Sequence, residues 1–303
     1  MAGADERPEV RTEGAGPFTT RIVQPLDEGG TAEWESRLAR KRGAVVIRPA
    51  GHAQGVHRHA DAAALGRLRR LNSTASSAFA IGGALFVLGA AVAQFGWGGA
   101  TTSAVVYFVG GLFFNTGGYA SLLQVINAPR PEHGPHELIT PRWRWWSFEP
   151  MRIDWLSTFL LFTGTLVFGI NLVDSFLHGL SAQQTNEFVW GPDMIGCALF
   201  LISGHLALVE VCHGRLGVRT HELGWWVVAV NQLGSFLFLV SALAAYARPA
   251  TGVMVDVMVA NWGTLAGALC FLVGGVLQGF EHPVAAPASA ARLDVGEIGL
   301  NRA

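Results

Sequence analysis

The chain has 303 residues, of which 50% are hydrophobic and only 14% are charged, and its mean hydropathy is +0.35. Because soluble domains usually carry about 25% charged residues, this composition argues against an ordinary soluble enzyme. The formal net charge of −1 provides no long-range attraction to nucleic acid, so nucleic acid is not expected as a partner.

Residues 1–74 precede the first long apolar run and are expected to form a cytoplasmic arm. Few of them are apolar, so the arm is predicted to be largely disordered. Residues 31–35 have the pattern of a helix N-cap followed by a short amphipathic helix. The basic end of this helix is expected to be solvated or to lie on anionic lipid headgroups. That basic end consists of Arg37, Arg40, Lys41 and Arg42.

Six apolar runs follow, each long enough for a helix to cross about 30 Å of hydrocarbon, which takes about 20 residues. They are residues 75–97, 103–126, 155–177, 189–212, 224–246 and 258–280. The predicted fold class is therefore all-α, a polytopic membrane protein of six transmembrane helices paired as three hairpins. The predicted segments are hairpins at 75–126, 153–212 and 213–280, a cytoplasmic loop at 127–152 and a cytoplasmic tail at 281–303.

Basic residues predict the orientation of these helices, because cytoplasmic segments are enriched in Lys and Arg. All but one of the 21 basic residues fall on one side of the predicted spans, and Arg248 is the exception. The expected location is the cell membrane of a bacterium, with both termini cytoplasmic. The loop sequence Arg-Trp-Arg-Trp-Trp at 142–146 is typical of the headgroup zone.

Every predicted span contains a Gly followed four residues later by a Phe. The pairs are Gly82/Phe86, Gly110/Phe114, Gly164/Phe168, Gly196/Phe200, Gly234/Phe238 and Gly267/Phe271. A Gly and a Phe one turn apart lie on one helix face, so the glycine leaves a hollow into which a neighbouring helix can place a ring. We interpret the pattern as a hairpin present three times, with its packing contacts near the bilayer midplane.

The second span of each hairpin continues the pattern. Gly118, Gly204 and Gly275 follow their Phe by four residues, and Gln124, Glu210 and Glu281 follow six residues later. These last three are expected to have a role at the cytoplasmic border, such as capping a helix or pairing with Arg215.

The first hairpin contains Ile-Gly-Gly-Ala-Leu-Phe at 81–86 and Phe-Val-Gly-Gly-Leu-Phe-Phe at 108–114. These segments resemble the YrhK-like domain of bacterial membrane proteins, a two-helix hairpin with a Gly-small-aliphatic-Phe motif in each helix. The resemblance covers most of residues 75–280 as three copies. It implies an integral membrane protein of unassigned activity, and it transfers no catalytic residue to this chain.

Polar residues at membrane depth are costly and are therefore candidate site residues. They are Asn115, Tyr119, Asn171, His205, Asn231 and Gln232. The alternative is that the amides only form hydrogen bonds between helices and that His205 is a core imidazole. His52, His57 and His59 have a spacing that a metal could use, but neither cysteine nor a rigid scaffold accompanies them, so no metal is predicted.

Several activities lack their sequence signatures. No lysine lies in any predicted span, so a retinal Schiff base is excluded, and the chain has no Walker A, H-E-x-x-H or G-x-S-x-G sequence. The preferred interpretation is a non-enzymatic membrane module without a cofactor, which binds membrane lipid or, through its arm, a protein partner. The alternative is a transporter or channel whose cavity the six polar residues line. A redox subunit holding haem or quinone through His205 is a third reading, and no oligomeric state is indicated.

Overall fold

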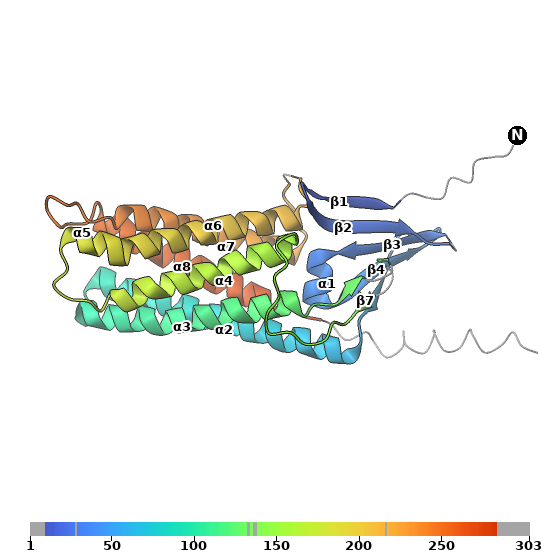
Figure 1. Cartoon of the computed structure of the whole chain (residues 1–303), viewed down its shortest axis with the longest axis horizontal. Coiled ribbons are helices and arrows are strands. Elements are labelled where there is room, and N and C mark those ends of the chain that lie inside the picture. Colours follow the sequence, from blue (N-terminus) through green and yellow to red (C-terminus); the bar gives the residue numbers. More distant parts are fainter. Residues whose placement is uncertain (1–9, 28, 132–133, 136–137, 216, 284–303) are drawn as a thin grey trace, which may run out of the picture.

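The structure is a computed structural model that describes residues 10–283 except 28, 132–133, 136–137 and 216. Long helices form a bundle, and an antiparallel sheet lies against one end of it (Figure 1). The helical part of the predicted fold class is confirmed, but the class is not purely α because of this sheet. Most of the predicted tail at 281–303 lies outside the described residues.

The sheet is built from the N-terminal segment, which corrects the expectation of a largely disordered arm. Its five strands pair in sequence order, each antiparallel to the next. They are β1 (Arg11–Ala15), β2 (Phe18–Pro25), β3 (Gly30–Glu35), β4 (Ala44–Pro49) and β5 (Val56–His59). Residues 31–35, expected at a helix start, lie in β3, and the short helix α1 (Ser36–Arg42) connects β3 to β4.

Few apolar residues suffice for this sheet because ion pairs to the buried Glu33 and contacts with the bundle contribute to its stability. Glu33 is 2% exposed and pairs with Arg21 on β2 and with Arg48 on β4, at 2.7 Å from the latter. The hydroxyl of Thr20 lies 3.0 Å from Nδ1 of His213, which follows the bundle helix α6 (Gly191–Val211). The composition rule for disorder failed here because it counts only apolar core within the segment itself.

Six long helices form the bundle at the predicted places. They are α2 (Ala62–Phe95), α3 (Gly99–Ile126), α4 (Ile153–Asp174), α6, α7 (Leu223–Ala244) and α8 (Val257–Gly279). The short strands β6 (Arg130–Pro131) and β7 (Leu138–Ile139) lie in the loop before α4, and α5 (Ala182–Thr185) with the π-helical turn η1 (Asn186–Trp190) leads into α6. Helix α2 begins well before position 75, because Asp61 caps it by accepting the backbone N–H of Ala64.

The helices are neighbours in the order α2, α3, α4, α6, α7 and α8, and α8 also lies against α2, so the ring is closed. Five of the six are long and apolar enough to cross a membrane, with α5, η1 and α6 counted as one helix. Helix α3 has the length but a lower hydropathy, because small and polar residues such as Asn115 and Thr116 dilute its apolar ones.

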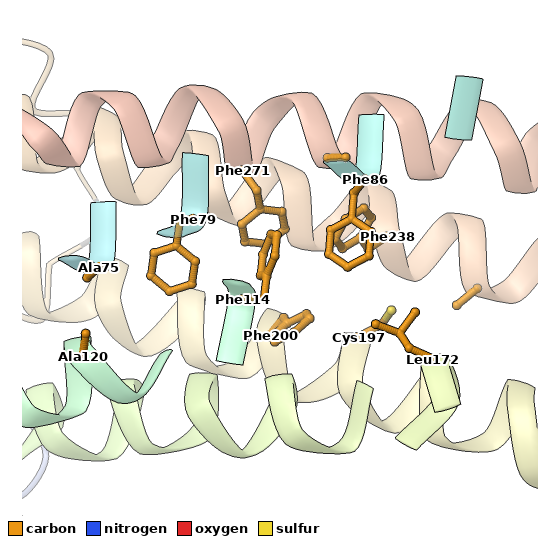
Figure 2. Close-up of a cluster of buried hydrophobic side chains, with 12 residues drawn as sticks. Ala75, Phe79, Phe86, Phe114, Ala120, Leu172, Cys197, Phe200, Phe238 and Phe271 are labelled. Atoms are coloured by element: carbon orange, nitrogen blue, oxygen red, sulfur yellow. The ribbon is translucent and has the colours of Figure 1, made fainter. Parts of the chain in front are cut away.

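The core of the bundle is a layer of phenylalanine rings contributed by all six helices. Figure 2 shows buried rings of this layer, among them Phe86, Phe114 and Phe238. Its members are Phe86, Phe114, Phe168, Phe200, Phe238 and Phe271, the same residues that follow glycine by four. Neighbouring ring centroids lie 4.9–6.5 Å apart, the range in which aromatic pairs attract. The layer therefore joins the three hairpins at one level.

The glycines of the pairs admit these rings within each hairpin. A Cβ on Gly82 would lie 2.6 Å from Phe114, one on Gly164 would lie 2.8 Å from Phe200, and one on Gly267 would lie 2.5 Å from Phe238. Their partners Gly110, Gly196 and Gly234 lie against the opposite helix of the same hairpin. The later glycines Gly118, Gly204 and Gly275 instead lie against the next hairpin around the ring. Each kind of close helix contact thus occurs in all three hairpins.

Candidate functional site

Helix α1 lies between the sheet and the adjacent end of the bundle (Figure 1). Arg37, Arg40 and Lys41 are spaced three and four residues apart and therefore lie on one helix face. Arg40 and Lys41 are buried, with 7% and 4% exposure. The helix ends at Gly43, whose φ of 61° is left-handed, so the chain can turn directly into β4.

The two arginines of this face bind carboxylates from different hairpins. Arg37 donates to Glu281 through Nε (2.9 Å) and Nη2 (2.6 Å), a two-pronged contact at the end of α8. Arg40 donates through Nη2 to Glu210 on α6 at 2.8 Å. Asp154, at the start of α4, lies 3.9 Å from Nε of Arg40 and belongs to the same hairpin as Glu210. Both arginines are therefore held by carboxylates in poorly hydrated surroundings.

Lys41 binds the remaining hairpin, but through amides. Its Nζ donates to Oδ1 of Asn72 on α2 (3.0 Å) and to Oε1 of Gln124 on α3 (2.8 Å). Asn72 and Gln124 are fully buried. Within the described parts of the chain, no carboxylate forms an ion pair with Lys41.

The basic residues of α1 donate hydrogen bonds to the three residues that recur in the sequence pattern, namely Gln124, Glu210 and Glu281. The expected border role is therefore specific: each accepts hydrogen bonds from one basic residue of α1. Two expectations are corrected. Glu210 pairs with Arg40 and with the hydroxyl of Ser36 rather than with Arg215, and most of the basic end of the helix is bound to the bundle rather than to headgroups.

Burial and neighbouring charges shift the protonation of this cluster. Burial alone would raise the pKa of Glu281, but Arg37, Lys41 and Arg40 outweigh it and hold the pKa of that carboxyl below its usual value. Burial lowers the pKa of the Lys41 ammonium well below its usual value, and the nearby positive charge of Arg40 lowers it further. Glu281 is thus the well-compensated charge of the cluster and Lys41 the poorly compensated one.

A cavity of about 110 Å³ lies directly beneath α1, inside the ring of helices. Its walls come from all three hairpins and carry hydroxyl and amide groups as well as apolar side chains. The polar members from the helices are Ser121, Ser157, Thr158, Ser203, Glu210, Asn231, Ser235 and Gln278. Arg37, Arg40 and Lys41 also line this cavity, and Phe79, Phe200 and Phe271 are among its apolar members. It is a polar chamber that the basic face of α1 covers.

The structure does not bring the six predicted polar residues together. Asn115 lines an outer groove between α3 and α4, and Tyr119 donates to the carbonyl of Trp145 at 3.2 Å. Asn171 is 9% exposed on α4, while His205 is exposed on the outer face of α6. These four residues belong to separate surroundings and form no common site.

The remaining two candidates lie closer to the axis, and only one reaches the chamber. Gln232 donates to the carbonyl of Leu201 at 3.3 Å, a contact between α7 and α6. Asn231 lines the chamber and donates to the carbonyl of Val227 on its own helix at 2.9 Å. Most of these polar groups therefore serve helix contacts or face outward.

The loop between α3 and α4 is held at the same end of the bundle by its own charge network. Glu149 accepts hydrogen bonds from Arg130 (2.8 Å) and Arg152 (2.6 Å). Partial burial would raise the pKa of Glu149, but these arginines and Ser147 outweigh it and lower the pKa to about 2. In the Arg/Trp segment of this loop, Trp145 and Trp146 are 65% and 52% exposed.

Two of the three histidines of the N-terminal segment lie on one strand. His57 and His59 lie on β5 with their ring centroids 6.3 Å apart. In the part of the chain that the structure describes, no three His, Cys, Asp or Glu side chains cluster so as to hold a metal ion.

Reasoning from the sequence missed that the basic face of α1 binds the end of the bundle. Its signal was present, because three cations at helical spacing match three border residues that recur with the glycine pattern. Comparison with protein-family models, with curated proteins and with solved structures found no match to this chain.

Proposed function

We propose that the chain is a multi-pass integral membrane protein without enzymatic activity, built from three repeated hairpins whose cytoplasmic end is closed by the N-terminal domain. In this proposal α3 crosses the membrane with the other five long helices, and both termini are cytoplasmic. The protein acts as a membrane module that binds lipid around the bundle and presents its sheet to a protein partner. The resemblance of its hairpins to the YrhK-like domain agrees with this class.

The attachment of α1 carries this proposal. One short helix contacts all three hairpins through Arg37, Arg40 and Lys41, with one basic residue for each hairpin. Such an arrangement fixes the relative positions of the hairpins, which is a structural role. It also places the sheet outside the apolar part of the bundle, where exposed strand groups can meet another protein.

Helix α3 fits the proposed six-span topology although its hydropathy is lower. It contains no charged residue and lies between α2 and α4 in the closed ring. Its small residues, such as Gly110 and Gly118, allow the close backbone approach that helices use in lipid. An even number of spans also agrees with the excess of basic residues on one side.

A transporter or channel for a small solute is the second candidate, and the chamber beneath α1 favours it. Of the six polar residues expected to line a solute pathway, only Asn231 lines the chamber. The chamber is closed at the sheet end by bound charges rather than by a loose loop. This arrangement supports the module over the transporter.

Two measurements test the proposal. A fluorescent-protein fusion at the C-terminus is expected to fluoresce and an alkaline phosphatase fusion to be inactive, and the opposite pattern would refute the topology. In proteoliposomes, the native protein and a Glu210→Gln, Glu281→Gln double variant are both expected to leave potassium and glycerol permeability at the level of empty vesicles. Flux that appears when these two contacts are removed would establish the transporter instead.

A further inference from the structure

The basic residues that cover the chamber are compensated unequally. Arg37 is compensated by Glu281 and Arg40 by Glu210, each at hydrogen-bonding distance, and Asp154 lies 3.9 Å from Nε of Arg40. Among the described residues, the acceptors of Lys41 are two neutral amide oxygens, and Lys41 is 4% exposed. An isolated buried ammonium is costly unless a counter-charge is near. Among the described residues, Lys41 therefore has no carboxylate within ion-pairing distance.

The chamber also has unpaired donors. Among the described residues, Nε of Arg40 and Nε2 of Gln278 are buried and have no hydrogen-bond partner. Both residues are 7% exposed and both line the chamber. Two N–H groups without acceptors beside an uncompensated ammonium are what a bound anion requires.

The carboxylate of the chamber is already in use, which argues against a cation. Glu210 is the one carboxylate among the described residues that line it, and its two oxygens accept from Ser36 and from Arg40. Water could satisfy the unpaired donors, but it could not balance the charge of Lys41.

The size of the chamber limits the ligand. It measures about 110 Å³, while a single water needs roughly 10–15 Å³ of such space. An ion of a few heavy atoms fits together with some water. A large organic anion is too bulky for this space between α1 and the aromatic layer.

We propose that this chamber is a binding site for one small monovalent anion, of the size of chloride, nitrate or formate. The ion would lie beneath α1, accept hydrogen bonds from Arg40 and Gln278, and balance the charge of Lys41. The site would link the N-terminal domain to all three hairpins in the same way whether or not the protein conducts any solute.

Equilibrium binding of radioactive chloride to the full-length protein in detergent, in a potassium gluconate background, tests this assignment. We expect saturable binding of one chloride per chain, with nitrate and formate competing and gluconate not competing. Lys41→Gln is expected to weaken binding at least tenfold, and Lys41→Arg is expected to restore most of it. Arg215→Gln is the matched control, because it removes one positive charge from a side chain that is 79% exposed, and it should leave the affinity unchanged.

A second variant keeps the test decisive if Lys41→Gln fails to fold. Gln278→Leu removes an unpaired donor without changing any charge, and it is expected to weaken chloride binding severalfold. The absence of saturable binding to the native protein would overturn the assignment. So would an affinity that neither variant changes. Chloride binding without vesicle permeability would establish the anion site and contradict the transporter hypothesis.

Discussion

The aromatic layer at mid-depth and the basic face of α1 at the sheet end fix the same three hairpins by different physical means. In the aromatic layer, each ring fits beside a glycine, and the attraction is the sum of many weak contacts. At α1, the attraction comes from a few charged hydrogen bonds between poorly hydrated groups. The difference teaches that close packing fixes the positions of the hairpins in the apolar part of the bundle, while charged hydrogen bonds fix them at the end next to the sheet.

The two kinds of contact predict different responses of protein stability to mutation and to pH. Shape-based packing carries no titrating group, so it should respond strongly to added volume and little to pH. A charge-based contact should respond to the loss of a single partner and to protonation. Mutations at each level can therefore test whether the division is real.

The largest effect is expected where two backbones nearly touch. A Cβ on Gly275 would lie 2.7 Å from the backbone nitrogen of Ala80, so a larger residue must push α8 away from α2. We expect Gly275→Val to lower the free energy of unfolding by more than about 4 kcal/mol or to prevent folding, as measured by unfolding in mixed micelles. Gly66→Ala is the control, because its Cβ meets open space and alanine favours the helix. If Gly275→Val behaves like the control, the shape argument fails.

The glycine pattern was readable from the sequence because it depends on local spacing. The places of the six helices followed from the apolar runs, although α3 does not reach the hydropathy of a span. The Gly/Phe pairs identified the residues that form the aromatic layer. The sheet was not predictable in this way. Its strands are short, and the ion pair between Arg21 and the buried Glu33 stabilises it only after β2 and β3 have paired.

The candidate site was predictable only in part, for the same physical reason. The recurrence of Gln124, Glu210 and Glu281 marked one half of the α1 contact, but their partners come from residues far away in the chain. The six polar residues chosen by depth alone mostly face separate contacts, since depth does not determine which side of a helix faces the axis. Only Asn231 reaches the chamber.

A smaller effect is expected when one charged partner at α1 is removed. Glu210→Gln removes the carboxylate that accepts a hydrogen bond from the buried Arg40 and leaves only Asp154 at 3.9 Å, so the free energy of unfolding should fall by about 3 kcal/mol. Glu222→Gln is the matched control, because Glu222 is 51% exposed and pairs with Arg219 at the surface, where such pairs contribute at most about 1 kcal/mol. The measurement is unfolding of each variant in mixed micelles. Equal losses in both variants would mean that the α1 contact is no stronger than a surface pair.

The smallest effect concerns pH and separates the two levels most cleanly. Lys41 is the only lysine of the chain. The charges of Arg37 and Arg40 on its own helix and of Glu210 and Glu281 from the bundle act on its ammonium without direct contact. It donates hydrogen bonds to the amide oxygens of Asn72 and Gln124. Burial holds the pKa of Lys41 well below 10.5. Between that lowered pKa and 10.5 the unfolded chain binds more protons than the folded chain, so the free energy of unfolding should rise with pH.

The rise can reach about 1.4 kcal/mol per pH unit, and it should be absent in Lys41→Met. Unfolding of the native protein and of this variant between pH 7.5 and 10, in gluconate buffer, measures the difference in slope. The Gly66→Ala variant should keep the native slope, because it does not touch the charged cluster. A small anion in the chamber would stabilise the ammonium and so reduce the slope of the native protein. If the slope persists in Lys41→Met, this residue is not the buried charge that joins α1 to the first hairpin, and the contrast between the two levels does not hold.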